Sequence, residues 1–229
     1  MKLNQIYHAS EPITEKDAFV NKYTYMGYFL KLVHYRFLTI KTLIELAKIG
    51  ENLPDSVSEW IKEDGKVLAV FNVSDGICLQ MYCRTLMRKK FITVNNGYSM
   101  PYGIGMLMPN FRFGIPLVIC EGLADRDFLA YCYPNVVAMG NKRTTLIQMQ
   151  TIKALTDNVI LAYDNDATGQ SSFYTDKKKF EEMGFQVSWL RHLGKDPGEV
   201  VDFAMKGDMV SFNHCVNRYK QQIRSLCRK

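Results

Sequence analysis

The sequence predicts an α/β protein in which an α+β segment precedes a four-stranded parallel sheet flanked by helices. From residue 116 onward, short apolar runs rich in β-branched residues alternate with longer segments of helical periodicity, a pattern typical of parallel sheets. Before that point the pattern is less regular, and an Asp-Gly step between two apolar runs predicts an antiparallel hairpin. The 229 residues suffice for one large domain or two small ones.

The parallel sheet is expected to have four strands, and each of the first three is followed by a segment with helical periodicity. We expect these strands at residues 117–121, 135–139, 158–164 and 185–190. The intervening helices are expected at residues 125–131, 144–155 and 170–183, the last one ending at Gly184. Four strands joined by three crossovers would form one compact unit.

The first half predicts fewer elements. A helix over residues 39–48 would end at Gly50, and two strands would flank Ser74-Asp75-Gly76, the second running on toward residue 94. The aromatic and basic segment 21–37 is expected to contribute to the core, and the last twenty residues to form a basic helix. The change of pattern near residues 113–116 separates residues 1–113 from residues 114–205. The basic C-terminal helix makes up a third part, residues 206–229.

Charge and cysteine usage narrow the class of protein. A net charge of +6 and a pI near 8.9 favour a polyanionic partner such as nucleic acid. The six cysteines include no Cys-x-x-Cys pair, so we expect reduced thiols and no zinc in this chain. The N-terminus has no apolar signal region, and no apolar run is long enough to span a membrane. These features predict a cytoplasmic protein without a membrane partner.

Three carboxylates follow strands of the predicted sheet. Asp164 and Asp166 stand where the third strand gives way to a Gly-containing turn, and Glu121 ends the first strand. Ligands bind at the carboxyl ends of parallel strands. Residues i and i+2 of an extended segment point to one side, with Cα atoms roughly 6.6 Å apart. We therefore expect Glu121, Asp164 and Asp166 to be catalytic and to hold Mg²⁺, with Mn²⁺ as the alternative.

Each carboxylate also has a purely structural explanation. Asp at a strand-to-helix junction commonly caps the helix, although three acids at two matched junctions favour a metal site. Asp125 and Asp127 fall in the first helical turn after Glu121, where the helix dipole favours acids; we keep Asp125 as a candidate ligand and regard Asp127 as structural. Asp196 is either a further metal ligand or the cap of a helix that has Pro197 at its first position.

The motifs around these carboxylates resemble a known family. Glu121-Gly122 and the later Asp164-Asn165-Asp166-Ala167-Thr168-Gly169 resemble the Toprim fold of bacterial primases, topoisomerases and some nucleases. The upstream half is similar to the DnaG-type primase catalytic core, in the order Arg36-Phe37-Leu38, Phe71-Asn72-Val73, Arg84-Thr85-Leu86, Lys90-Phe91 with Asn95, and Pro101-Tyr102-Gly103. Lys195-Asp196-Pro197 resembles the step that follows the last Toprim strand in that family. The resemblance covers about residues 35 to 205.

The resemblance implies a DNA primase that makes short RNA primers on a single-stranded DNA template from NTPs, with Mg²⁺ as cofactor. The small size of such a core fits a phage or mobile-element origin and, if the protein is phage-encoded, the cytoplasm of a bacterial host. The family's zinc-binding and helicase-binding domains have no counterpart in this sequence. A replicative helicase or a separate zinc-binding subunit is therefore the expected protein partner. Asn141-Lys142-Arg143 departs from the small and hydroxyl residues usual after the second strand's glycine.

Basic residues supply candidate contacts for the template and the nucleotide. Those expected to bind phosphates are Arg84, Arg88, Lys90, Asn95, Lys142, Arg143 and Lys195. Lys142 and Arg143 precede an expected helix N-terminus, where backbone N–H groups favour anions. For Lys89 and the basic C-terminal residues, a solvated surface explains the charge equally well or better.

Two other functions fit the same residues. A Toprim nuclease would use the same metal ions to activate water, and a non-enzymatic replisome subunit would only bind nucleic acid. The three functions differ in their expected products. A primase would synthesise primers, a nuclease would cleave the strand, and a non-enzymatic subunit would bind nucleic acid without either reaction. A topoisomerase is disfavoured, because the chain is short and no tyrosine is marked as a strand-cleaving nucleophile.

Overall fold

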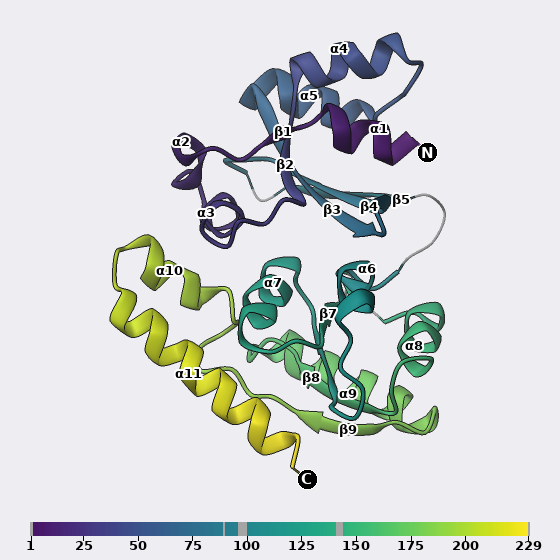
Figure 1. The fold of residues 1–229 in the computed structure, drawn as a ribbon, viewed down its shortest axis with the longest axis vertical. Helices are drawn as coiled ribbons and strands as arrows, with labels where there is room; N and C mark the ends of the chain where they lie inside the picture. The colour runs from purple at the N-terminus through teal and green to yellow at the C-terminus, as the bar shows by residue number, and fades with distance from the viewer. Residues whose placement is uncertain (1, 89, 96–99, 141–143, 229) are drawn as a thin grey trace. The chain divides into compact units, whose positions relative to one another are not determined.

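The computed structural model describes residues 2–88, 90–95, 100–140 and 144–228 (Figure 1). The chain divides into two compact units, Met1–Tyr98 and Ser99–Lys229. This division falls earlier in the chain than the change of pattern near residues 113–116, because Tyr102 pairs with Ala138 and thereby joins the second unit. No helix in the described residues is long and apolar enough to cross a membrane.

The first unit contains an antiparallel sheet of order β1-β2-β3-β4-β5. Its central hairpin forms at the expected place, because Asp75 and Gly76 both adopt positive φ angles, 48° and 75°, and a two-residue turn of this kind matches the strand twist. A connection over residues 85–90 then separates two strands where one continuous strand was expected. The strands are β1 (Glu11–Pro12), β2 (Tyr35–Thr39), β3 (Lys66–Ser74), β4 (Ile77–Arg84) and β5 (Phe91–Asn95).

In the described part of the first unit five helices accompany this sheet, and only one of them was expected from the sequence. That one, α4, begins where the Thr39 side chain accepts a hydrogen bond from the Thr42 N–H (3.2 Å), and Gly50 follows it with a φ of 74°. The unit's core joins residues of α1, α4, α5 and the inner strands, among them Leu3, Leu46 and Trp60. The helices are α1 (Lys2–Ala9), α2 (Glu15–Ala18), α3 (Lys22–Phe29), α4 (Ile40–Lys48) and α5 (Asp55–Asp64).

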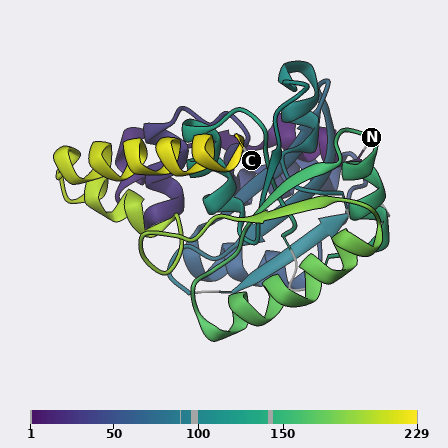
Figure 2. The same ribbon diagram turned by 90° about the horizontal axis from the view of Figure 1, so that it is seen from below.

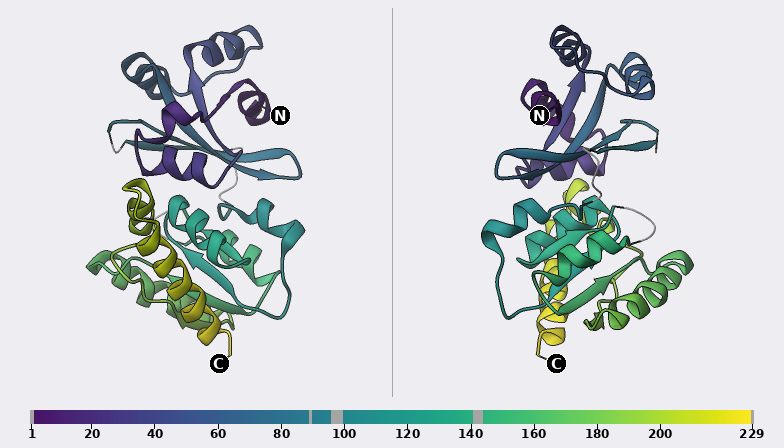
Figure 3. Two further views of the ribbon diagram at one scale, coloured as in Figure 1. Left: turned by 60° about the vertical axis from the view of Figure 1, so that its left-hand side comes forward. Right: turned by 90° about the vertical axis from the view of Figure 1, so that its right-hand side faces the viewer.

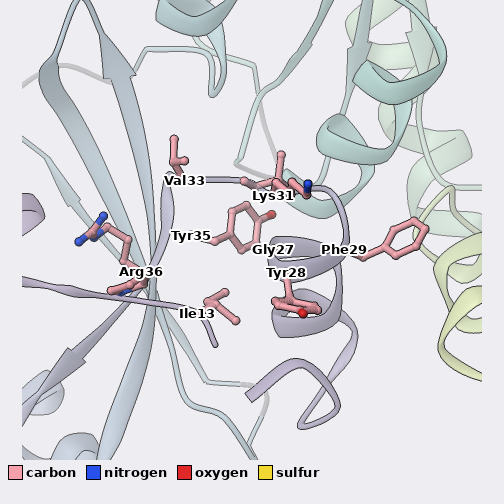
Figure 4. Close-up of a pocket in the computed structure, with 10 residues that line it drawn as sticks. Ile13, Gly27, Tyr28, Phe29, Lys31, Val33, Tyr35 and Arg36 are labelled. Carbon is pink, nitrogen blue, oxygen red and sulfur yellow. The ribbon is translucent and has the colours of Figure 1, made fainter. Parts of the chain in front are cut away.

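The aromatic segment 21–37 forms α3 and β2, and only part of it is core. Tyr25 and Tyr35 are buried, whereas Tyr28 and Phe29 are 41% and 37% exposed. The exposed part borders an apolar cavity of about 430 Å³ within the first unit, and Figure 4 shows the side chains that line it. The expectation of a purely structural role therefore holds for only part of the segment.

The second unit contains the predicted parallel sheet, in the order β7-β6-β8-β9. All three neighbouring pairs are parallel, and Cys120 lies opposite Ala162 at the ends of the two central strands. The fold class predicted from the sequence is thus confirmed. The strands are β6 (Leu117–Cys120), β7 (Val136–Ala138), β8 (Asn158–Ala162) and β9 (Gln186–Trp189).

Helices cover both faces of this sheet. Alternate strand residues Ile119 and Leu161 share one core cluster with Met149 of α8 and Phe180 of α9, while α7 packs against β6, β7 and α11. Figure 2 shows α9 and α11 on opposite sides of the sheet, and in Figure 3 the long α11 runs along the second unit to the C-terminus. The helical elements are α6 (Ile104–Leu107), the 3-10 turn Met108–Asn110, α7 (Leu123–Cys132), α8 (Leu146–Lys153), α9 (Ala167–Glu182), α10 (Glu199–Met205) and α11 (Met209–Leu226).

The segment before α6 is held to the parallel sheet by a buried polar network. The Tyr102 hydroxyl donates to Asp127 (2.8 Å), and the Arg126 guanidinium pairs with the other oxygen of Asp127 (2.7 Å). Gly103 has a φ of 86°, and a Cβ there would come within 2.4 Å of Arg126 Nε. A glycine is therefore required at this position for two reasons, the backbone angle and the close approach of the guanidinium.

Candidate active site at the carboxyl edge of the parallel sheet

Two acidic residues lie at the carboxyl ends of the adjacent strands β6 and β8. Glu121 follows β6 directly, and Asp164 comes two residues after β8. Both side chains are half-buried. The backbone N–H of Asp164 donates to the Glu121 carboxylate, so the two residues are neighbours, and the negative charge of Asp164 contributes to raising the pKa of Glu121. The structure thus brings together two of the three carboxylates at the edge where the sequence placed them.

The Glu121 carboxyl is not stabilised as an anion by its surroundings. Burial, followed by the charge of Asp164, raises its pKa to about 7, although the backbone N–H of Asp164 partly offsets this. Its Oε1 atom is buried and has no hydrogen-bond partner in the described part of the chain. A buried polar atom without a partner costs free energy, and proteins retain such atoms where a ligand or ion completes them. Glu121 therefore fits a role as a cation ligand.

Asp166 is engaged differently from the other two. It is the N-cap of α9, with Oδ1 accepting a hydrogen bond from the Gly169 N–H (2.9 Å) and Oδ2 lying 3.2 Å from Lys195 Nζ. The Gly169 N–H and then Lys195 lower the pKa of Asp166, so it remains ionised. The capping alternative considered for a lone Asp is thus realised here. Asp166 holds the turn, and one of its oxygens faces a lysine.

Asp125 and Asp196 also bond to backbone N–H groups. Asp125 Oδ1 accepts from Gly198 (3.0 Å), which ties α7 to the segment before α10, and Asp196 Oδ1 accepts from Glu199 (3.0 Å) at the start of α10. For Asp196 the structure thus shows the helix-start bond that was one of its two sequence interpretations. The assignment of both residues as metal ligands stays a prediction.

Among the residues that the structure describes, no three His, Cys, Asp or Glu side chains form a ready metal-binding group. The partial set still fits a hard cation, because Glu121 Oε1 lacks a partner and Asp164 repels Glu121 across the strand ends. Asp166 could join them by exchanging its contact with Lys195 for the metal. The residues that would hold Mg²⁺ are therefore Glu121 and Asp164 first, with Asp166 beside them.

Sequence reasoning missed a buried acid, Asp176 of α9. Its carboxylate accepts hydrogen bonds from the Tyr163 hydroxyl (2.9 Å) and from Thr144, and pairs with Lys179 (2.8 Å). It also contributes to raising the pKa of Glu121. A signal was available, because Asp176 falls between Phe173 and Phe180 on the buried stripe of the helix.

The basic candidates of the first unit differ in availability. Arg84 stacks its guanidinium 4.4 Å from the Tyr23 ring centroid, Arg88 pairs with Glu63 (2.9 Å), and Lys90 is exposed. Asn95 pairs with Gln80 in the β4–β5 ladder. Lys142 and Arg143 lie outside the described residues, so the structure does not address their roles.

Gly169 is placed where α9 approaches the strand end. A Cβ at this position would meet the Asp164 carbonyl oxygen at 2.3 Å and the carbonyl carbon at 2.8 Å. Gly169→Ala must therefore displace the backbone of a candidate ligand, and we expect a loss of about 1–3 kcal/mol in the free energy of unfolding. Urea unfolding measures it, with Ser171→Ala, exposed on the same helix, as the control. Equal stabilities of the two variants would contradict the close approach.

His192 predicts a pH dependence of stability. Its Nε2 lies 3.1 Å from the Ala162 carbonyl and its Nδ1 lies 3.3 Å from the Tyr219 hydroxyl; burial lowers the pKa of His192 from 6.5 to about 4. The folded state therefore excludes a proton that the unfolded chain accepts below pH 6.5. The contribution of His192 to the free energy of unfolding is therefore fully present above pH 6.5. It falls by about 2–3 kcal/mol as the pH drops toward 4.

The measurement compares wild type with His192→Gln by urea unfolding at several pH values. The stability difference between them should shrink between pH 6.5 and 4, whereas His214→Gln, at an exposed site on α11, should follow wild type throughout. A difference that is constant with pH would show that His192 is not held neutral by burial.

Comparisons with known proteins agree with this geometry. A family described as Toprim-like matches residues 118–201, while a search of curated protein sequences finds no match. A DnaG primase catalytic domain bound to ssDNA has a TM-score of 0.61 at 16% identity, covering 93% of this chain and 79% of that chain. The RNA polymerase domain of Mycobacterium tuberculosis primase DnaG has a TM-score of 0.61 at 16% identity, and the match covers 90% of this chain and 77% of that chain. The E. coli primase catalytic core has a TM-score of 0.56 at 16% identity, and the match covers 87% of this chain and 68% of that chain.

The matched ranges cover the motifs on which the resemblance rested. The Toprim-like match begins in β6 and ends in α10, so it contains Glu121, Asp164, Asp166 and Lys195. The structural matches extend over most of the chain, and at this identity they establish the fold. Residues 118–201 therefore match a family described as Toprim-like, and the chain has the fold of the DnaG-type primase catalytic core.

Proposed function

We propose that this chain is a primase-type nucleotidyltransferase that joins NTPs into short RNA primers on single-stranded DNA. The observation that carries the proposal is the half-buried Glu121, whose Oε1 lacks a partner beside Asp164, in a chain with the fold of primase catalytic cores. One of the similar structures, a DnaG primase catalytic domain, holds single-stranded DNA. The net charge of +6 favours the same class of partner.

In this proposal, Glu121, Asp164 and Asp166 hold Mg²⁺ at the strand ends. Mg²⁺ would supply charge neutralisation for the reacting phosphates and position a 3′-OH against an α-phosphate. The chain's own residues fix the ligands: the Gly169 N–H orients Asp166, and the Asp164 N–H orients Glu121. Lys195, paired with Asp166, stands where it would meet an incoming phosphate. Asp125 and Asp196 are proposed as further ligands.

The first unit would contribute template and nucleotide contacts. Arg84 and Lys90 are proposed for this role, since neither makes an ion pair with a carboxylate in the described residues, and Arg88 would have to leave Glu63. The solved Aquifex aeolicus primase combines a zinc-binding domain with its RNA polymerase domain, and its TM-score to this chain is 0.52. We propose that a separate zinc-binding subunit, together with a replicative helicase, serves this chain.

The test supplies the full chain with Mg²⁺, radiolabelled NTPs and a single-stranded template of random sequence, because the initiation sequence is unknown. Labelled dinucleotides and longer products are the expected result, and EDTA should abolish them. Cleavage of the template without synthesis would assign the chain to the Toprim nucleases. Template binding with neither reaction, unchanged in Asp164→Ala and Asp166→Ala, would identify a non-enzymatic binding subunit.

A further inference from the structure

A second, smaller cavity lies beside the candidate metal site, at the end of the edge strand β9. β8 and β9 are parallel neighbours (Figure 1). The cavity, whose lining includes Trp189 at the end of β9, and the carboxylates therefore lie at the same edge of the sheet. Its volume is about 250 Å³, and most of its surface is polar. It is lined by Asn165, Gln170, Tyr174, Trp189, Arg191 and His192.

Trp189 forms the wall of this cavity within a stack of three side chains. Its indole lies parallel to the Phe173 ring, with centroids 4.1 Å apart and an interplanar angle of 17°, and Arg191 Cζ lies 4.4 Å from the indole centroid. This contact holds the guanidinium against the indole, and the Arg191 N–H groups make no hydrogen bond in the described residues, so they can bind a ligand. The indole Nε1 is buried and has no hydrogen-bond partner in the described residues.

The cavity offers hydrogen-bond donors and one positive charge. Arg191 is exposed, and no carboxylate of the described residues lies within ion-pair distance of it. Trp189 Nε1 can only donate a hydrogen bond, and the exposed Tyr174, whose hydroxyl can also donate, is a second lining residue. The lining residues that the structure describes include no Asp or Glu, and His192 adds no charge near neutral pH, because burial lowers its pKa to about 4.

The remaining lining residues brace the cavity. Asn165 donates through Nδ2 to the His192 and Gly194 carbonyls (2.9 and 2.6 Å), and Gln170 donates through Nε2 to the Asn165 carbonyl (3.0 Å). The neighbouring charge of Asp166 is paired with Lys195. The Asn165 and Gln170 amides are therefore already engaged with backbone carbonyls, and the candidate donors among the described lining residues are Arg191, Trp189 and Tyr174.

We propose that this cavity binds a phosphate group, held by the Arg191 guanidinium, the Trp189 indole N–H and the Tyr174 hydroxyl. An oxyanion matches a donor-rich cavity with one positive charge and no acidic lining. That the phosphate belongs to a nucleotide or to a nucleic-acid backbone rests on the proposed function. The site would add a phosphate contact beside the metal ligands, on the side of the edge strand.

The test uses Trp189 as its own reporter. The chain has two tryptophans, so Trp60→Phe leaves Trp189 as the only indole. The full chain in this background is titrated without Mg²⁺ with inorganic triphosphate, UTP, a short oligothymidylate lacking terminal phosphates, and uridine. We expect the phosphate compounds to change the Trp189 emission and uridine to leave it unchanged.

Variants identify the residues that bind. Arg191→Gln should weaken binding roughly 10- to 100-fold, as loss of a charge-assisted hydrogen bond does, and Tyr174→Phe several-fold. Arg191→Lys keeps the charge but loses the planar stack, and should fall between Arg191→Gln and the parent. Lys178→Gln, whose side chain is 80% exposed on the same unit, removes one charge elsewhere and should bind like the parent.

The outcomes separate the phosphate source and the two proposals. Binding of UTP and triphosphate without oligothymidylate identifies a triphosphate tail, and oligothymidylate binding identifies a backbone phosphate. Equal binding of uridine and UTP, or an Arg191→Gln variant that is folded by circular dichroism and binds like Lys178→Gln, would overturn the phosphate site. The titration needs neither Mg²⁺ nor synthesis, so phosphate binding can be found even if the primer assay fails. Likewise, primer synthesis can be found even if this cavity binds no phosphate.

Discussion

Asp164→Asn is expected to lower the rate of primer synthesis about 1,000-fold under saturating template and NTPs. The amide keeps the shape of the side chain, so the fold should persist. However, it removes a negative charge beside Glu121 at the point where the proposed Mg²⁺ would be held. A single-turnover assay with preassembled template separates this loss in rate from any loss in binding.

The matched control is Asp157→Asn. Asp157 immediately precedes β8, at the end of the strand opposite the candidate site, and its side chain is 66% exposed beside Lys153. This variant removes one carboxylate charge from the same unit and should retain the wild-type rate. If Asp164→Asn kept more than a tenth of wild-type synthesis, Asp164 would not be a metal ligand in the reaction.

The sequence predicted the part of the fold that depends on periodic burial. The central strands β6 and β8 are buried on both faces except at Asn158, so they form apolar runs that end before Glu121 and Asp164. Their parallel pairing then places the following acids at one edge, independent of any side-chain detail. This is why the position of Glu121 and Asp164 could be inferred before the structure was considered.

Several helices of the first unit escaped prediction although some carry a readable stripe. In α5 the residues Val57, Trp60 and Ile61 are buried at helical spacing, but the helix is short and its cap is Pro54 instead of a hydrogen-bonding residue. In α3 aromatic residues stand on both the buried and the exposed sides, so no single face is marked. Local patterns are weak where a helix buries only part of its apolar surface.

Side-chain partners within the site could not be read from spacing. Asp166 and Asp164 look equivalent in the sequence, but only Asp166 meets both the Gly169 N–H and Lys195. This difference depends on the path of the chain after β9, because that path brings Lys195 next to the turn that contains Asp166. The cavity proposed to bind phosphate depends on the same segment, because its lining residues Arg191 and His192 follow β9.

Asp127→Ala is expected to lower the free energy of unfolding of the second unit by about 3–5 kcal/mol, the largest loss of stability that we expect. Asp127 was regarded as structural from its place in the first helical turn, and its actual partners are stronger than a helix dipole. It is 2% exposed and satisfies both Arg126 and the Tyr102 hydroxyl. Removing it leaves the buried guanidinium without a counter-charge.

Urea unfolding followed by Trp189 fluorescence in the Trp60→Phe background reports on this unit alone, since Trp60 belongs to the first unit. Tyr102→Phe should cost only about 1 kcal/mol, because it removes one hydrogen bond and leaves the ion pair. Arg126→Met combined with Asp127→Leu should recover much of the loss, since no buried charge remains. If the single and double variants were equally unstable, apolar packing of α7, and not the unpaired charge, would account for the effect.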